Sequence, residues 1–156
     1  MKYIASDHVG FHLKKQIILC RPEFVDLGCE ADNESVDYPV YAKKVVTRIL
    51  DDLKNGIDSF GVLVCGTGLG MSYAANRYKG IRAAEIQPDP HSRETARLAK
   101  AHNNANMLCL GGRQIKIEEA LELIEIVLAT EFERRHQKRL DMLDEEEPNK
   151  LTEISL

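Results

Sequence analysis

Short apolar runs alternate along the chain with longer segments in which apolar residues recur every three or four positions. Runs of four to eight residues are typical of buried strands, and the segments between them are typical of helices that bury one face. Five runs fit this description: KYIAS (2–6), FVDLG (24–28), FGVLVCG (60–66), IRAAEI (81–86) and NMLCLGG (106–112). We therefore expect a β–α unit that occurs five times.

This alternation predicts a Rossmann-like α/β fold. Right-handed crossover connections place helices on both faces of a parallel sheet, which gives a three-layer α/β/α sandwich. Ligands of such sheets bind at the carboxyl ends of the strands. The residues that follow predicted strands are therefore the first candidates for a functional site.

The last periodic segment predicts one long C-terminal helix over residues 117–143. Its apolar positions fall three or four residues apart, as in a helix that packs one face on the core: Leu121, Ile124, Leu128 and Phe132. Residues 144–156 begin with acidic side chains and contain Pro148, which stops a helix. We expect one domain over residues 1–143 and an acidic tail over 144–156, either frayed or clasped on a neighbouring subunit.

Composition narrows the possible partners and location. The chain has 156 residues, 29% of them charged, and a net charge of -4, which argues against nucleic acid as a partner. It lacks a signal-peptide pattern and any run of about 18 apolar residues, so we expect no membrane association. Its four cysteines form no CxxC pair, which favours a reduced, cytoplasmic protein over a zinc or dithiol site.

The segment VLVCGTGLGMSYAAN (62–76) predicts an anion-binding turn. Glycines at 66, 68 and 70 lie between a strand and a helix, where unpaired backbone N–H groups can converge on one anion. A dinucleotide fingerprint would need glycine at position 71, where Met71 stands, although Glu85 resembles a carboxylate that binds a ribose. A nucleotide-binding module therefore remains an alternative.

Cys65 lies directly before this turn. A thiol at a helix N-terminus can have a lowered pKa and so act as a base or a nucleophile. Cysteine is also a common small core residue, as Cys109 is expected to be, and position alone slightly favours that interpretation. A cysteine-dependent hydrolase is a further hypothesis, which the sequence around Cys65 does not mark.

Polar residues also flank other predicted strands. Asp7 and His8 follow the first strand, and Tyr38 precedes Pro39 at the expected start of a helix. Helix capping by Asp7 is the alternative to a functional role.

The fifth predicted strand is flanked on both sides. His102 and Asn103 precede it, and Arg113 follows it. Turn formation is the alternative role for the asparagines.

The segment RRHQKR concentrates cations in an acidic chain. Arg135 and Arg139 lie four residues apart, with His136 between them, and on a helix they would share a face suited to a phosphate. A solvated basic face is the common alternative.

Five segments together resemble the B-type ribose-5-phosphate isomerase family, which is related to the galactose-6-phosphate isomerase subunits. They are DHVGFHLKK, DYPVYAKKV, CGTGLGMSYAANRYKGIRAA, HNNANMLCLGGR and RRHQKRLDML, and the likeness spans roughly residues 1–143. The resemblance implies a five-stranded parallel sheet. It also implies interconversion of D-ribose 5-phosphate and D-ribulose 5-phosphate, in the non-oxidative pentose phosphate pathway, without metal or organic cofactor.

The resemblance also implies roles for individual residues. Cys65 would be the general base between C2 and C1, while Gly66, Gly68 and Gly70 supply N–H groups to the enediolate and Thr67 hydrogen-bonds the reacting oxygens. The remaining roles are ring opening by His102 with Asp7, orientation of hydroxyls by Tyr38 and Asn103, and phosphate binding by His8, Arg113, Arg135 and Arg139, with His136 nearby.

The family's sites lie between subunits, so the resemblance implies a homodimer or homotetramer in which His102 and the arginines face a partner's Cys65 loop. Allose 6-phosphate and galactose 6-phosphate are alternative substrates. A module that binds a nucleotide or another ligand without chemistry is the alternative from another class.

Overall fold

Five parallel strands form one sheet in the computed structural model, which describes residues 1–145. Its order is β2-β1-β3-β5-β4, and each neighbouring pair is parallel. The strands are β1 (Lys2–Ser6), β2 (Val25–Asp26), β3 (Phe60–Cys65), β4 (Ala83–Glu85) and β5 (Met107–Gly111). The predicted five-stranded parallel sheet is confirmed, although β2 and β4, the two edge strands, are shorter than the apolar runs that predicted them.

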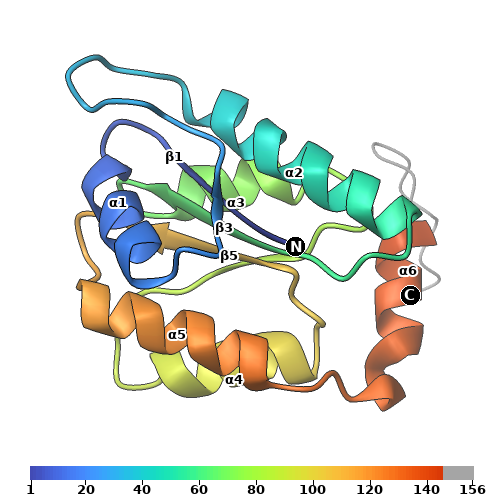
Figure 1. Ribbon diagram of the computed structural model, residues 1–156. Helices are drawn as coiled ribbons and strands as arrows, with labels where there is room; N and C mark the ends of the chain where they lie inside the picture. The colour runs from blue at the N-terminus through green and yellow to red at the C-terminus, as the bar shows by residue number, and fades with distance from the viewer. Residues whose placement is uncertain (146–156) are drawn as a thin grey trace, which may run out of the picture.

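Helices cover both faces of the sheet. Figure 1 shows α2 and α3 on one face, and α1, α4 and α5 on the other. It also shows α6 beside the edge at which the strands begin. The helices are α1 (Phe11–Cys20), α2 (Tyr38–Lys54), α3 (Leu69–Ala75), α4 (Ser92–Ala101), α5 (Ile117–Ala129) and α6 (Gln137–Glu145). The predicted three-layer α/β/α sandwich is confirmed.

The alternation of side chains along the central strands divides the core into two halves. Successive residues of a strand point to opposite faces, so Val62 and Val64 pack with α1, α4 and α5. Leu63 and Cys65 pack with α2 and α3 on the other face. All six residues of β3 are buried, and this burial fixes its register and the position of its last residue, Cys65.

The prediction of one long helix over residues 117–143 is wrong. α5 ends at Ala129, and the Thr130 hydroxyl donates to the Ile126 carbonyl at 2.6 Å. The N–H of Glu133 then donates to the carbonyl of Ala101, at the end of α4, across 2.8 Å. A continuous helix could not make this tertiary bond, because that N–H would point along its own axis.

After this break the chain re-enters helical structure in two steps. A 3-10 turn, η1 (Arg134–His136), precedes α6. Arg135 therefore lies in η1 and Arg139 in α6, so the two arginines do not share one turn of a continuous α-helix as predicted. The sequence does not show the end of α5, because the three- to four-residue spacing of apolar residues continues past Ala129 to Phe132.

The end of α6 overlaps the predicted acidic tail. Asp144 and Glu145 belong to α6, and the Asp144 carboxylate accepts a hydrogen bond from the Gly80 N–H at 2.9 Å. Residues 146–156, which include Pro148, lie outside the described residues, so the tail and the domain boundary stay predictions. None of the helices within residues 1–145 has the length and apolar character needed to cross a bilayer.

A buried lysine ties α1 to the edge of the sheet. Lys14 is fully buried, and its ammonium donates to the Asp26 carboxylate at 2.6 Å and to the Cys29 carbonyl at 2.7 Å. Burying an ammonium is costly unless it is paired in this way. These bonds hold β2, which has only two residues, against α1.

Candidate active site

The turn after β3 folds back on the sulfur of Cys65. The backbone N–H of Gly68 donates to the Cys65 Sγ atom at 3.2 Å. Gly68 has a φ of +84°, and a Cβ atom there would lie 3.1 Å from the carbonyl oxygen of Cys109, so the turn requires glycine. A hydrogen bond to sulfur favours the thiolate over the thiol. The geometry therefore gives Cys65 a feature expected of a base, which a plain core cysteine lacks.

The loops after β1, β3 and β5 meet at the carboxyl edge of the sheet. The Gly112 N–H donates to the Cys65 carbonyl at 2.7 Å, and the Arg113 N–H donates to the Gly66 carbonyl at 3.2 Å. The Arg113 guanidinium covers Gly66, because a Cβ atom on Gly66 would lie 2.9 Å from Arg113 Nη1. A Cβ atom on Gly112 would lie 3.1 Å from the Cα atom of Gly10 in the first loop. Arg113 thus lies beside the turn that the sequence predicts to bind an anion.

Three further predicted residues lie at this edge. The buried Asp7 carboxylate accepts the Gly10 N–H at 2.9 Å, so it does bind backbone at the start of α1. His8 Nδ1 accepts the Val36 N–H at 3.2 Å, which leaves the proton of the neutral ring on Nε2, a donor suited to a phosphate oxygen. The Tyr38 ring covers the first turn of α3, since a Cβ atom on Gly70 would lie 2.8 Å from its Cζ atom.

A second group of predicted residues surrounds the start of α6. The rings of His102, at the end of α4, and His136 have centroids 4.4 Å apart. Arg139 Nη1 lies 3.0 Å from His136 Nδ1, and Arg135 donates to the Glu133 carboxylate at 2.8 Å. This group holds His102, Asn103, Arg135, His136 and Arg139.

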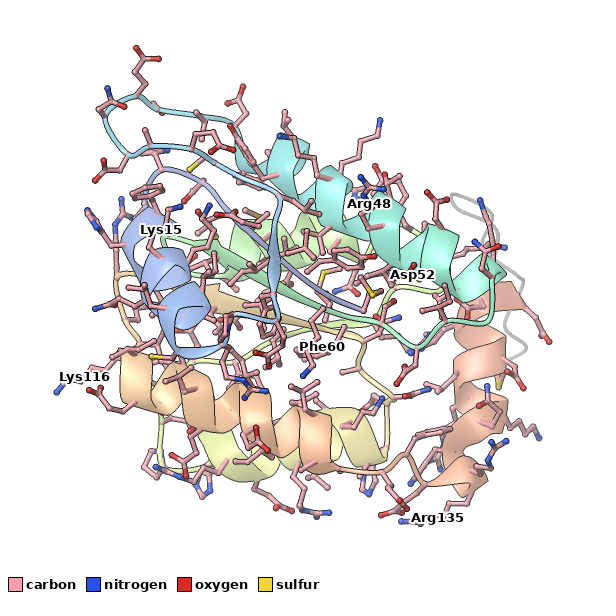
Figure 2. All side chains as sticks on the ribbon, in the orientation of Figure 1. Lys15, Arg48, Asp52, Phe60, Lys116 and Arg135 are labelled. Atoms are coloured by element: carbon pink, nitrogen blue, oxygen red, sulfur yellow. The ribbon has the colours of Figure 1, made fainter. Side chains whose placement is uncertain are left out.

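Within one chain the two groups lie at opposite edges of the sheet, one where the strands end and the other where they begin. Cys65 ends β3 and Arg113 follows β5, whereas His102 and Asn103 precede β5. Figure 2 shows Arg135 beside α6 at one end of the molecule and Lys116 at the other. Lys116 directly precedes α5 and lies three residues after Arg113. One chain therefore does not bring His102 to Asp7 or Cys65, nor Arg135 and Arg139 to His8 and Arg113.

His136 is buried beside the cationic side chains. Burial lowers the pKa of its imidazole, and the charges of Arg135, His102 and Arg139 lower it further, which favours the neutral ring. Its Nε2 atom is buried without a hydrogen-bond partner among residues 1–145. His136 is therefore less basic than a free histidine, although it lies among cationic side chains.

A metal ion has one candidate set of ligands among the described residues. His102, Glu133 and His136 place one ligand atom each within 4.8 Å of one another. Arg135 and Arg139 already bond Glu133 and His136, and their positive charges oppose a bound cation. The chemistry of the cluster suits an anion better.

A cavity of about 680 Å³ opens near the second group, between α6 and the connection from α3 to β4. Asn103 is the one predicted site residue that lines it, together with Tyr78, Ile81 and Leu140. The lining does not include Cys65 or its loop.

Glu85, a candidate ribose ligand by sequence, lies next to Gln87, which no sequence motif marks. Gln87 Nε2 donates to the carbonyl of Thr67 at 3.0 Å and also contacts the Glu85 carboxylate. Burial raises the pKa of the Glu85 carboxyl, and the Gln87 bond partly opposes that shift. Glu85 therefore contacts Gln87, which in turn binds the loop after Cys65. Gln87 could have been found, because it follows β4 as the other residues of this edge follow their strands.

Known proteins resemble this chain over most of its length. A family model described as Ribose/Galactose Isomerase matches residues 3–143. The ribose-5-phosphate isomerase B of Escherichia coli K12 is 37% identical over 152 residues, which cover 92% of this chain and 95% of that protein.

Solved structures extend the similarity to three dimensions. The ribose 5-phosphate isomerase of Thermotoga maritima is 49% identical with a TM-score of 0.81, covering 92% of this chain and 97% of that one. The ribose-5-phosphate isomerase B of Mycoplasma genitalium, solved with bound ribulose-5-phosphate, is 37% identical with a TM-score of 0.81, covering 92% and 93%.

Proposed function

The chain belongs to the ribose/galactose isomerase family, as its motifs predicted, and we propose that it interconverts D-ribose 5-phosphate and D-ribulose 5-phosphate. It is an enzyme of the isomerase class. The observation that carries the proposal is the Cys65 thiol at the carboxyl edge of the sheet, with the Gly68 N–H on its sulfur. The ribulose-5-phosphate bound to the Mycoplasma genitalium relative supports this choice of substrate.

Cys65 acts as the base in this proposal. Its thiolate takes the proton from C2 of the open-chain aldose and returns it at C1, so one carbon is oxidised and its neighbour reduced within the same molecule. The intermediate is an enediolate, whose negative oxygen needs fixed donors. We assign this role to backbone N–H groups of the turn between β3 and α3 and of the start of α3, at Gly66, Thr67 and Gly70, while the Gly68 N–H donates to the Cys65 sulfur and the Thr67 hydroxyl adds a side-chain donor.

In this proposal the phosphate and the sugar ring are bound by residues from both edges of the sheet. His8 and Arg113 lie beside the Cys65 loop, and Arg135 and Arg139 lie at the opposite edge. We assign ring opening to His102 of one chain and Asp7 of another, and the orientation of sugar hydroxyls to Tyr38 and Asn103. Holding the phosphate, which does not react, positions the carbons beside the thiol.

These assignments require at least two chains. Each edge of one chain then meets the other edge of its partner, and a twofold axis completes two identical sites. We propose a homodimer, or a homotetramer built from such dimers. All four cysteines are free, which supports the predicted cytoplasmic location.

Turnover measurements test the proposed function. The purified protein, in the presence of a chelator, should convert ribose 5-phosphate, and Cys65→Ala should lose about 10²–10⁴-fold in kcat. Cys20→Ala is the matched control, because Cys20 is exposed at the end of α1. Full activity in Cys65→Ala would assign the base elsewhere.

The choice of sugar needs a parallel assay, because the family name includes galactose. Ribose 5-phosphate should give a higher kcat/KM than allose 6-phosphate or galactose 6-phosphate. Turnover of a six-carbon sugar alone would reassign the substrate. No turnover of any of the three would favour a module that binds ligands without chemistry.

A further inference from the structure

Both polar groups of the peptide bond between Thr67 and Gly68, its C=O and its N–H, make hydrogen bonds to side chains. Its carbonyl oxygen, on Thr67, accepts a hydrogen bond from Gln87 Nε2 at 3.0 Å. Its N–H, on Gly68, donates to the Cys65 sulfur at 3.2 Å. A trans peptide is planar, and its C=O and N–H point in opposite directions. Fixing the carbonyl therefore fixes the direction of the N–H.

This link adds to the backbone bonds of the turn, in which the N–H groups of Gly112 and Arg113 donate to the carbonyls of Cys65 and Gly66 and not to the peptide between Thr67 and Gly68. Gly68 lies in the left-handed region, with a φ of +84°, and glycine samples many conformations. The carbonyl grip comes from Gln87, which follows β4 and lies 20 residues away in sequence. Gln87 thus restrains the one peptide of the turn whose N–H faces the sulfur.

Gln87 is itself held in place. Its amide nitrogen donates both to the Thr67 carbonyl and to the Glu85 carboxylate, and an amide NH₂ group has two hydrogens for these two acceptors. Both Glu85 and Gln87 are half-buried, so their bonds are shielded from water. Glu85 also packs against Gly68, because a Cβ atom on Gly68 would lie 3.2 Å from Glu85 Cγ.

We propose that Gln87, anchored by Glu85, is a positioning residue that holds the Gly68 N–H on the Cys65 sulfur and so stabilises the thiolate. This role deepens the proposed function, in which that thiolate is the base. Gln87 touches the turn and leaves the reacting carbons to other groups. The Gln87 amide acts on the sulfur only through the peptide between Thr67 and Gly68. Its effect is therefore measured by the pH at which Cys65 loses its proton.

The charged and titratable groups around Cys65 set the expected sign. Cys109 of β5 is buried between Cys65 and Glu85, and its own thiol pKa is raised by burial, then by those two groups. Arg113 lies over Gly66, and Asp7 follows the strand paired with β3. A Glu85 carboxylate without its bond to Gln87 would gain a proton more readily. The loss of its negative charge would then favour the thiolate of Cys65. A raised pKa in a Gln87 variant therefore reports the lost N–H bond.

The titration of Cys65 tests the proposal directly. Gln87→Met keeps the length of the side chain and removes both donors. The thiolate is followed by its ultraviolet absorbance across a pH series, each protein being compared with the same protein carrying Cys65→Ala. We expect the thiolate absorbance to appear at higher pH in Gln87→Met than in the wild type, because a hydrogen bond to the charged form favours that form.

Two controls separate position from charge and from general damage. Glu85→Gln removes the negative charge and leaves Gln87 its bond to Thr67, so the pKa of Cys65 should stay or fall. Gln16→Met makes the same substitution on the exposed side of α1 and should change nothing. Gln87→Asn is a second test variant, because its amide is one methylene too short for both acceptors.

An unchanged pKa of Cys65 in folded Gln87→Met or Gln87→Asn overturns the proposal, as does an equal rise in Glu85→Gln. The readout is independent of turnover, so a protein that isomerises no sugar can still show the shift. In an active protein, the same variants should lose kcat with little change in KM, and raising the pH should restore part of the loss.

Discussion

The sulfur of Cys65 accepts a hydrogen bond from the backbone N–H of Gly68, three residues later in the chain, at 3.2 Å. The bond exists because the turn passes through a left-handed conformation at Gly68, with the carbonyl of Cys109 packed beneath it. A small residue at one position therefore links the geometry of the sheet to the chemistry of the thiol.

Gly68→Ala should weaken both fold and activity. Alanine at this positive φ costs about 1 kcal/mol, and its Cβ atom would meet the Cys109 carbonyl at 3.1 Å, so the turn must shift. We expect a lower Tm and a loss of about 10²-fold in kcat. Gly56→Ala is the control, since Gly56 also has a positive φ, +68°, but no atom within 4 Å of the added methyl. Equal kcat in both variants would contradict a role of the turn in catalysis.

A mixture of two inactive variants should recover activity if the two edges of the sheet meet between chains. Cys65→Ala and His102→Ala each spoil one edge and leave the other intact. Random pairing of equal amounts gives half mixed dimers, each with one intact site, so about a quarter of the activity should return.

The mixing experiment needs unfolding and refolding of the two proteins together, because stable dimers exchange slowly. Each variant refolded alone is the control and should stay inactive. Mixed samples no more active than the sum of the two would indicate that both residues act within one chain.

Arg113→Ala should weaken phosphate binding. Its guanidinium covers Gly66 at the edge of the turn, where it can pair with a substrate anion. Loss of a charge-assisted bond predicts a rise of about 10–100-fold in KM for ribose 5-phosphate, with a smaller change in kcat. Arg93→Ala, on the surface of α4 where Arg93 pairs with Glu122, should leave KM unchanged. An unchanged KM in Arg113→Ala would place the phosphate elsewhere.

Lys14→Met should destabilise the fold without touching the site. It removes both bonds that join α1 to the β2 edge, and loss of one partner of a buried pair costs about 3 kcal/mol. Lys15→Met is the control, because Lys15 is exposed and contacts the same Asp26 carboxylate at 3.4 Å. Urea unfolding at neutral pH should separate the two variants, and equal free energies of unfolding would refute the structural role of Lys14.

The same pair makes stability depend on acid. Burial acts to raise the pKa of the Asp26 carboxyl, but the Lys14 bond, the Gly28 N–H and the two lysine charges lower it below its ordinary 3.8. A lowered folded pKa means that the stabilisation is complete above 3.8 and is lost as the pH falls through the folded value. The wild type should therefore lose its advantage over Lys14→Met in urea unfolding below about pH 4. A difference that stays constant as the pH falls well below that value would contradict the pairing.

Local patterns predicted the sheet because its strands are buried on both faces. The apolar runs at 2–6, 60–66 and 106–112 match β1, β3 and β5 to within one residue at each end. The break after Ala129 was missed because its cause is tertiary, the bond from Glu133 to the end of α4. No local signal encodes a partner that lies 32 positions away.

The separation of the candidate site into two groups could partly be predicted from the sequence. In a parallel sheet, residues before a strand and residues after a strand lie at opposite edges. His102 precedes β5 and Cys65 ends β3, so their positions relative to the strands already placed them apart. The grip of Gln87 on Thr67 was not readable, because it depends on β4 lying next to β5 in the sheet.

The placement of the two groups at opposite edges also bears on how such a protein can evolve. Mutations at one edge spare the other, so a duplicated gene could lose Cys65 in one copy and His102 in the other. If the sites are shared between chains, as proposed, neither product would work with itself, yet the mixed pair would keep one complete site. The layout of a single chain thus offers a short route from a self-assembling enzyme to an obligate partnership of two different genes.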